Sequence, residues 1–312
     1  MKILVTGSNG QLGQDVVKAL LAHGHEVIGC GTAELPVQAV DSGPSPFFSY
    51  QPLNITDERA VGLALSAIQP GALIHCAAWT AVDAAENPLV FDEVWAVNAI
   101  GSENLAKACA AVGAKMLYIS TDYVFDGHGE TPWPPDSRDF GPLNVYGKSK
   151  LEGEEAVRRH LDRFFVARVS WLYGLGGKNF VKTMLRAGCA NEQVRVVCDQ
   201  VGTPTYTADV AAILAAMVVT NQYGHYHVAN SGGYISWQAF CEEIYRQAGL
   251  STRVIPVTTA EYGLLKAIRP MNSRLDIRKL CELGIHPPHW QDALRRFLAE
   301  SCMADELRAN RA

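Results

Sequence analysis

The sequence lacks several features that would assign it to common classes of protein. Its eight cysteines form no CxxC pair and mostly lie in apolar stretches, so we expect neither disulfides nor a zinc site of that kind. Lys and Arg are dispersed and the net charge at pH 7 is −5, which argues against a nucleic-acid partner. The longest apolar runs, such as Val210 to Val219, are shorter than the roughly 20 residues that span a bilayer. We therefore expect no membrane association.

Other signatures are also missing. The chain opens with an apolar run, Met1 to Val5, and not with the charged and apolar regions of a secretory signal, so we expect a cytoplasmic protein. No His, Cys, Asp and Glu cluster has metal-binding spacing, and no Gly-x-Ser-x-Gly occurs, so neither metal nor serine-hydrolase chemistry is predicted. A composition of 48% hydrophobic and 19% charged residues excludes a disordered chain. The length of 312 residues predicts one large domain with a smaller lobe.

The first half of the chain alternates short apolar runs with helical patterns. The runs are continuously apolar, as strands of a parallel sheet covered on both faces must be. This order predicts the α/β class with a doubly wound parallel Rossmann sheet. The predicted strands are 3–6, 26–30, 72–77, 115–120 and 164–169, and the predicted helices are 11–23, 59–68, 91–112 and 146–160.

After Ser170 the alternation becomes less regular. We predict a helix over 180–188, a strand over 194–197, a helix over 209–219 and a strand over 224–228 that returns to the main sheet. Four prolines between Gly127 and Asn144 predict an ordered or lid-like loop. The expected division places residues 1–173 and 206–230 in the dinucleotide-binding domain and residues 174–205 and 231–312 in a smaller C-terminal α/β substrate-binding lobe.

A glycine-rich turn follows the first predicted strand and opens a helix. Its GxxGxxG spacing allows a tight turn, a close approach of backbone N–H groups to a pyrophosphate, and close packing of helix on strand. A turn this short also occurs without a ligand, but its place between a buried strand and an amphipathic helix favours cofactor binding. The predicted cofactor-binding residues of this turn are Gly7, Asn9, Gly10, Gln11, Leu12 and Gly13.

Further along, Asn54 and Ile55 are expected near the adenine, and Ala77 and Ala78 either form a wall of the cofactor site or are ordinary close packing. The end of the second strand, from Gly29 to Thr32, carries neither the acid typical of NAD-binding proteins nor the Arg typical of NADP-binding ones. The cofactor is therefore predicted to be NADPH or NADH.

Tyr146 and Lys150 form a YxxxK pair at the start of a predicted helix, where spacing i, i+4 places them on one face. An ammonium beside a phenol favours the phenolate, so we expect the pair to donate and accept a proton near neutral pH while Lys150 holds the nicotinamide ribose. Alone, the spacing is common in exposed helices. Thr121 favours the catalytic interpretation, because it lies at the end of a predicted strand, at the carboxyl edge of the sheet, where such folds bind ligands.

Two further polar residues have structural and catalytic interpretations. Asn98 lies in an apolar helix and is either a satisfied core amide or, as we favour, part of a proton relay that positions a water. His75 lies in an apolar strand, and we interpret it as a buried histidine rather than a catalytic one.

Together with these residues, several longer motifs resemble the dTDP-4-dehydrorhamnose reductase family of the extended short-chain dehydrogenase/reductases. They are Ser120 to Gly127 (STDYVFDG), Pro142 to Glu154 (PLNVYGKSKLEGE), Ser170 to Gly174 (SWLYG), Gly202 to Thr205 (GTPT) and Arg269 to Ser273 (RPMNS). The similarity covers nearly the whole chain.

The resemblance implies reduction of carbon 4 of dTDP-4-dehydro-L-rhamnose, with Tyr146 protonating the alkoxide and Thr121 holding the carbonyl. It implies a nucleotide-sugar substrate and leaves a homodimer open. The implied substrate-binding residues are Thr121, Asp122, Tyr123, Trp171, Asn179 and Arg269, the last two as candidates for the diphosphate.

The chain departs from the family at two places. Some members are described as binding magnesium between subunits, and here Ala190 stands where one acid would be, although Asp15 is present, so we predict no structural metal. The stretch from Val37 to Gln51 is longer than in compact members.

Two alternatives stay open. The first is another nucleotide-sugar reductase or epimerase, since the fold alone does not fix the substrate. The second is a regulatory subunit that binds the cofactor without turnover, as in the β subunit of methionine adenosyltransferase, which resembles this family.

Overall fold

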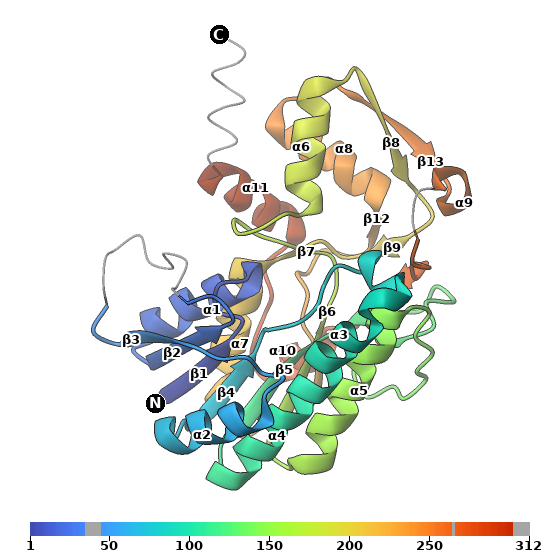
Figure 1. The fold of residues 1–312 in the computed structure, drawn as a ribbon. Coiled ribbons are helices and arrows are strands. Elements are labelled where there is room, and N and C mark those ends of the chain that lie inside the picture. Colours follow the sequence, from blue (N-terminus) through green and yellow to red (C-terminus); the bar gives the residue numbers. More distant parts are fainter. Residues whose placement is uncertain (35–44, 264–265, 302–312) are drawn as a thin grey trace.

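A computed structural model describes residues 1–34, 45–263 and 266–301 of the chain. Its centre is a seven-stranded, wholly parallel sheet in the order β11-β6-β5-β4-β1-β2-β3 (Figure 1). The predicted doubly wound Rossmann fold is therefore confirmed. The strands are β1 Lys2–Thr6, β2 Glu26–Gly31, β3 Phe48–Pro52, β4 Ala72–His75, β5 Lys115–Thr121, β6 Phe164–Val169 and β11 Gly224–His227.

Helices cover both faces of this sheet. Helices α1 (Gln11–Ala22) and α7 (Thr207–Val218) pack together on one face, and α2 (Glu58–Ile68), α4 (Gly101–Val112) and α5 (Val145–His160) lie side by side on the other (Figure 1). The apolar strands explain this arrangement, because successive side chains point to opposite faces.

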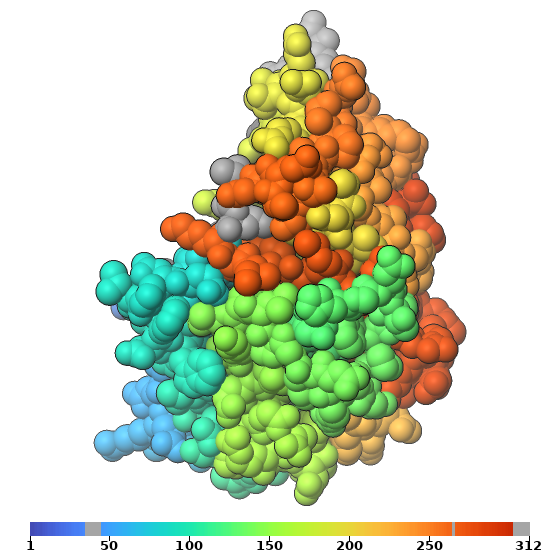
Figure 2. Space-filling view, turned by 90° about the vertical axis from the view of Figure 1, so that its right-hand side faces the viewer, coloured from blue at the N-terminus to red at the C-terminus, as the bar shows by residue number. Residues whose placement is uncertain are grey.

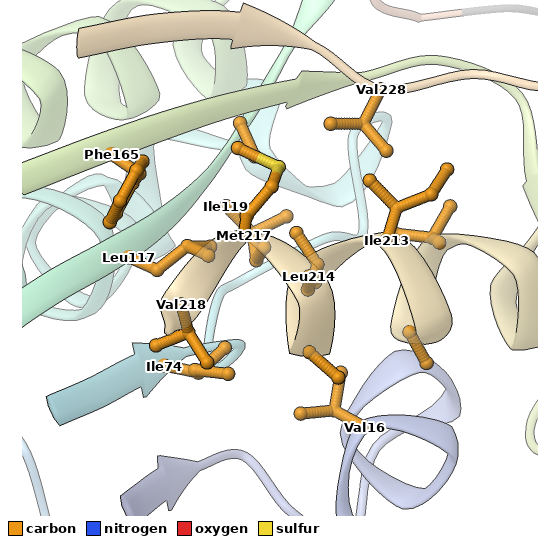
Figure 3. Close-up of a cluster of buried hydrophobic side chains, with 14 of the residues drawn as sticks. Val16, Ile74, Leu117, Ile119, Phe165, Ile213, Leu214, Met217, Val218 and Val228 are labelled. Atoms are coloured by element: carbon orange, nitrogen blue, oxygen red, sulfur yellow. The ribbon is translucent and has the colours of Figure 1, made fainter. Parts of the chain in front are cut away.

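Two apolar cores result from this alternation. Ile3 and Val5 join the core beneath α1 and α7, whereas Leu4 joins the core beneath α2 and α4. Figure 3 shows the first of these cores, in which α7 places Leu214 and Met217 among side chains of the sheet. A sheet that is apolar on both faces needs both helical layers.

Two parts of the large domain differ from the sequence prediction. Strand β3 was not predicted, because its sequence FSYQP is partly exposed and forms an edge of the sheet. The predicted helix 91–112 is interrupted: α3 (Phe91–Trp95) passes into a π-helical turn, Ala96–Ile100, before α4 begins. Single π turns of this kind are frequent at functional sites.

The smaller lobe has its own apolar core, which includes Tyr173, Leu185, Phe240, Trp290 and Phe297. Two short parallel strands flank its helices, and a three-stranded sheet, in the order β12-β9-β14, lies nearest the large domain. The helices of the lobe are α6 Phe180–Ala190, α8 Trp237–Ala248, α9 Thr259–Tyr262 and α11 Trp290–Glu300. Its strands are β7 Leu172–Tyr173, β8 Gln193–Val197, β9 Val201–Gly202, β10 Thr205–Tyr206, β12 Ile235–Ser236, β13 Arg253–Val257 and β14 Asn272–Ser273.

The proline-rich loop from Gly127 to Asn144 is fastened to the segment 266–276. Trp133 donates its backbone N–H to Arg274 and accepts one from Asp276, and the Asn144 side chain donates to the Ile268 carbonyl. Figure 2 shows the orange segment that includes 266–276 lying across the junction between the large domain and the lobe. The loop is therefore an ordered brace and not a free lid.

The expected division of the chain stays a proposal, and the structure differs from it at two places. Tyr173 and Tyr206, which that division assigns to the large domain, lie in the apolar core of the smaller lobe. Helix α10 (Arg278–Glu282), which that division places in the smaller lobe, contacts β11, and Leu280 lies in the core of the large domain. Residues 302–312 and most of the lengthened stretch from Val37 to Gln51 lie outside the described residues. In the described part of the chain, no helix is both long and apolar enough to cross a membrane.

Candidate active site

The glycine-rich turn forms the start of the cofactor site. Gly7 has a φ of +65°, and a Cβ there would lie 2.6 Å from the backbone nitrogen of Ala77. A Cβ on Gly13 would lie 2.1 Å from the Gly7 carbonyl oxygen, so the helix approaches the strand as closely as it does only because position 13 has no side chain. Gly10 is the N-cap of α1, which leaves the helix N-terminus open to a phosphate.

A pocket of about 370 Å³ extends from this turn along the carboxyl edge of the sheet. The end of β2, from Cys30 to Ala33, forms one side, and Trp79 and Val97 close another. Apolar walls, small residues and a helix N-terminus together fit a dinucleotide. The predicted residues that line the pocket are Gly7, Asn9, Gly10, Asn54, Ile55, Ala77 and Ala78.

The other three predicted residues of the turn do not line this pocket with their side chains. Leu12 belongs to the core beneath α1, and Gly13 packs on Gly7. The Gln11 side chain accepts a hydrogen bond from Asn179 at 3.0 Å. Their predicted contact with the cofactor stays a prediction, which backbone N–H groups at the helix N-terminus could provide.

Tyr146 is placed by the start of α5. The Asn144 side chain caps the helix by accepting from the Gly147 N–H at 2.8 Å. A Cβ on Gly147 would lie 2.3 Å from the Tyr123 carbonyl oxygen, so glycine allows α5 to begin directly against the short turn Asp122–Val124. This short turn follows Thr121, the last residue of β5. A hydrogen bond joins Thr121 to the Tyr146 hydroxyl. The structure thus brings the predicted acid and hydroxyl together.

Burial raises the pKa of the Tyr146 phenol, and the hydrogen bond with Thr121 only partly opposes that rise. The expectation that Lys150 tunes Tyr146 to donate and accept a proton near neutral pH stays a prediction. The Lys150 ammonium lies 4.0 Å from the centroid of the Tyr118 ring, where it makes a cation–π contact. The raised pKa makes Tyr146 a protonated acid.

Lys150 itself is 2% exposed. Burial lowers its pKa to about 7, while the carboxylate of Glu154, one turn further along α5, acts in the opposite direction. Glu154 is held by Arg168 through two hydrogen bonds of 2.9 and 2.7 Å, and both side chains are buried. This pair keeps a negative charge near Lys150.

Asn98 lies in the π-helical turn, and its side-chain amide makes three hydrogen bonds to the protein. Its oxygen accepts from the Trp79 N–H at 2.8 Å, and its nitrogen donates to the Trp79 carbonyl and to the Ser149 hydroxyl. Because both amide N–H groups already have protein partners, the side chain cannot donate to a relay water. The Asn98 oxygen keeps one lone pair that can accept from a water, so the favoured relay role stays a prediction, and the side chain also anchors the pocket wall to α5.

His75 is a buried strand histidine, as expected. It is 1% exposed, and its ring nitrogens bond to Thr6 at 2.7 Å and Ser102 at 3.1 Å. Burial, with the nearby Lys150 charge, lowers its pKa well below the usual value. The neutral ring therefore serves as a bridge between β1 and α4.

On the substrate side, Asp122 is buried and Tyr123 is half-buried. The Asp122 carboxylate is 2% exposed and accepts hydrogen bonds from Thr121 and Ser273, so it does not face an open site. The Tyr123 ring packs edge-on against Tyr146, with centroids 5.7 Å apart. Arg269 donates to the Tyr123 hydroxyl at 3.3 Å and forms an ion pair with Asp83 at 2.6 Å.

The predicted diphosphate pair, Asn179 and Arg269, is not brought together by a shared contact. Asn179 caps α6, accepting from the Lys182 N–H and donating to Gln11 and the Gly174 carbonyl. It therefore lies beside the cofactor helix, whereas Arg269 lies beside Tyr123. Its capping role alone accounts for an asparagine at this position.

Trp171 has a left-handed backbone, with a φ of +50°, which is uncommon for a bulky residue and typical of functional sites. Its ring stacks on Trp237 of α8 with centroids 3.6 Å apart. A Cβ on Gly202 would lie 2.8 Å from the Trp171 ring, so glycine is needed for the ring to fit. The smaller lobe thus fixes the orientation of this tryptophan.

Sequence reasoning missed several residues of the site. Trp237, Ser273 and Asp83 contact predicted residues from segments far away along the chain, and no local pattern indicates them. Ser120 and Ser170, at the ends of β5 and β6, have buried hydroxyls with no hydrogen-bond partner among the described residues. Buried hydroxyls normally have a partner, so these two are candidates to bind a ligand. Their place at strand ends was the available signal.

The described residues contain no group of three or more His, Cys, Asp and Glu side chains that could hold a metal ion. Asp15, the acid noted above, hydrogen-bonds to Thr207 of α7.

A seven-stranded Rossmann sheet with a YxxxK tyrosine beside a strand-end threonine, completed by a smaller lobe, defines an extended short-chain dehydrogenase/reductase. Residues 1–303 match the family described as RmlD substrate binding domain. The chain belongs to the dTDP-4-dehydrorhamnose reductase family.

Individual relatives cover almost the full length. The Bacillus subtilis spore coat polysaccharide biosynthesis protein SpsK is 39% identical, over 97% of this chain and 99% of that protein. The dTDP-4-dehydrorhamnose reductase of Streptomyces griseus is 39% identical, over 96% and 93%. The crystal structure of dTDP-4-dehydrorhamnose reductase from Bacillus anthracis in complex with NADP has a TM-score of 0.82 and 37% identity, over 96% of this chain and 99% of that one.

Proposed function

We propose that this protein reduces the 4-keto group of dTDP-4-dehydro-L-rhamnose to dTDP-L-rhamnose with NADPH or NADH. The observation that carries the proposal is the position of the Tyr146 phenol beside Thr121 at the carboxyl edge of the sheet, where burial raises the pKa of the phenol. Relatives named dTDP-4-dehydrorhamnose reductase, one of them with bound NADP, support the substrate and the cofactor.

The residues of the pocket fit the cofactor. The turn from Gly7 to Gly13 would hold the pyrophosphate, and Asn54 and Ile55 would contact the adenine. Lys150, which is buried and does not itself line the pocket, would bind the nicotinamide ribose. The reduced nicotinamide, when bound, supplies the hydride. The absence of Lys and Arg from residues 26–58, together with the lack of an acid at the end of β2, supports use of either cofactor.

The catalytic group acts on the keto oxygen. Thr121 donates a hydrogen bond to this oxygen, and Tyr146 donates the proton that turns the developing alkoxide into a hydroxyl. A raised phenol pKa suits this direction of the reaction, because the group must be protonated when carbon 4 is reduced. The Lys150 ammonium, at a pKa of about 7, stabilises the phenolate that is left behind.

The sugar nucleotide would lie between this group and the smaller lobe. Tyr123 and Trp171 would contact the sugar, and Arg269 is the candidate for the diphosphate, since a guanidinium matches phosphate geometry. The homodimer left open by the resemblance stays a possibility to be measured. Exposed apolar side chains on and beside α3, including Leu89, Phe91 and Trp95, support it, and light scattering would measure it.

The test is a coupled assay with the purified protein. dTDP-4-dehydro-6-deoxyglucose is supplied with a 3,5-epimerase and NADPH, and cofactor oxidation and the sugar product are followed together. We expect one NADPH oxidised per dTDP-L-rhamnose formed, and none when the 3,5-epimerase is left out. Isomerisation of the sugar nucleotide by this protein when the 3,5-epimerase is left out, without NADPH oxidation, would point to an epimerase. No change beyond that made by the added 3,5-epimerase would point to a regulatory subunit.

A further inference from the structure

Asp122 is a buried carboxylic acid next to the hydroxyl that holds the keto oxygen in the proposed reaction. It lies at the first position of the short turn after β5. Its Oδ1 accepts a hydrogen bond from the Thr121 hydroxyl at 3.2 Å, and its Oδ2 accepts one from the Ser273 hydroxyl. Ser273 belongs to β14 of the smaller lobe, so this carboxyl joins the catalytic threonine to the lobe.

The hydrogen bonds of Thr121 can be counted. A hydroxyl has one proton and two lone pairs. The Tyr123 N–H fills one lone pair at 3.2 Å, the proton is donated to Asp122, and the Tyr146 hydroxyl, which shares a hydrogen bond with Thr121, fills the other lone pair. In this arrangement Thr121 has no proton left for a keto oxygen, which needs a donor as negative charge develops on it.

Protonation of Asp122 reverses this bond. A neutral carboxyl can donate its O–H to the Thr121 oxygen and take the lone pair that the Tyr146 hydroxyl occupied, so the Tyr146 proton also becomes free for the substrate. The Thr121 proton is then free to point toward the substrate, while the Tyr123 N–H keeps its contact. All donors and acceptors of the threonine are then satisfied.

We propose that Asp122 is a positioning residue that directs the Thr121 proton, and that its neutral form is the one that supports reduction. This role rests on the proposed function. It differs from a direct contact of Asp122 with the sugar, because the carboxyl acts through Thr121 and is itself buried.

The surroundings of Asp122 agree with a neutral form near physiological pH. Burial raises its pKa to about 7, although hydrogen bonds from Ser273 and Thr121 oppose the rise. The ionisable groups that face it are the phenols of Tyr146 on α5 and Tyr123 on its own turn, and Arg269 and Asp83 act on Tyr123 from further out. Burial raises the pKa of both phenols, so both are neutral.

The direction of the pH effect follows. An acid whose neutral form is active loses activity as the pH rises through its pKa. Lys150, with a pKa of about 7, loses its charge over the same range. If both protons are required, the plot of log kcat/KM against pH should approach a slope of about −2 on the alkaline side.

Two variants separate the contributions. In Asp122→Asn the amide mimics the neutral acid and does not titrate, so the alkaline slope should fall to about −1, with no more than about a tenfold loss of kcat/KM at pH 6. In Ser273→Ala the carboxylate loses a donor and its pKa rises, so the decline set by Lys150 stays in place and the change of slope from about −1 to about −2 should move to a higher pH. Asp126→Asn is the matched control, because Asp126 accepts only the backbone N–H of His128 and should keep the native profile.

Several outcomes would overturn this role. A loss above about a thousandfold at every pH in a folded Asp122→Asn variant would mean that the carboxylate is the active form. Native slopes and midpoints in both variants would mean that Asp122 does not direct the threonine; if Asp122→Asn fails to fold, Ser273→Ala alone decides. Absence of NADPH oxidation by the native protein would overturn the proposed function and this role together, whereas unchanged profiles in an active enzyme would overturn this role alone.

Discussion

Replacing Arg168 by methionine should destabilise the protein by about 3 to 5 kcal/mol, because the Glu154 carboxylate would stay buried without its partner. Arg168 is completely buried, donates twice to Glu154 and once to the Pro135 carbonyl, and its guanidinium lies 5.0 and 5.3 Å from the ring centroids of Phe125 and Phe140. Because the site is buried, replacing these contacts with hydrogen bonds to water would cost a large amount of free energy. The loss is a large share of the stability of a typical domain.

Urea unfolding followed by circular dichroism measures this change as a shift of the midpoint at constant slope. The double variant Arg168→Met/Glu154→Met removes both charges and should recover at least about 2 kcal/mol of the loss. Arg158→Met is the matched control. Arg158 pairs with Glu155 on the exposed side of α5, the helix that also carries Glu154, so its loss should leave the midpoint unchanged. A loss below about 1 kcal/mol in the single variant, or a double variant less stable than the single, would refute the reasoning.

Three further predictions concern ligand binding. NADH and NADPH should both support reduction, and a preference above about a hundredfold, or about 2.7 kcal/mol, in kcat/KM would reveal a ribose contact that the end of β2 does not provide. Arg269→Ala should weaken binding of dTDP-sugars in calorimetry far more than binding of cofactor, and equal losses would remove Arg269 from the substrate site. Gly13→Ala should abolish tight cofactor binding, because a Cβ at 2.1 Å from the Gly7 carbonyl oxygen must move the helix; unchanged affinity would contradict this account of the turn.

The large domain could be predicted because its strands are apolar on both faces. Ile3, Leu4 and Val5 show this without reference to the rest of the chain. Strand β3 could not be predicted, since an edge strand needs fewer apolar residues and FSYQP resembles a loop. The π-helical turn around Asn98 was also hidden, because its sequence continues the pattern of the helix on either side.

Part of the site was predictable for a geometric reason. Parallel strands end at one edge of the sheet, so Thr121 and the glycine-rich turn had to meet there. The pKa of Lys150 was not predictable, because it depends on burial and on the carboxylate of Glu154. That carboxylate is paired with Arg168, which lies on β6. The partner of Asp122 was equally hidden, because Ser273 lies 151 residues further along the chain.

The central claim is that Tyr146 gives the proton to the reduced carbonyl. The most direct measurement compares Tyr146→Phe with the native protein in the coupled assay while cofactor affinity is measured by fluorescence titration. We predict a loss of kcat of at least about a hundredfold with little change in the Kd for NADPH, because the phenol oxygen is removed while the ring still packs on Tyr123. Turnover of the variant at the native rate would contradict the account.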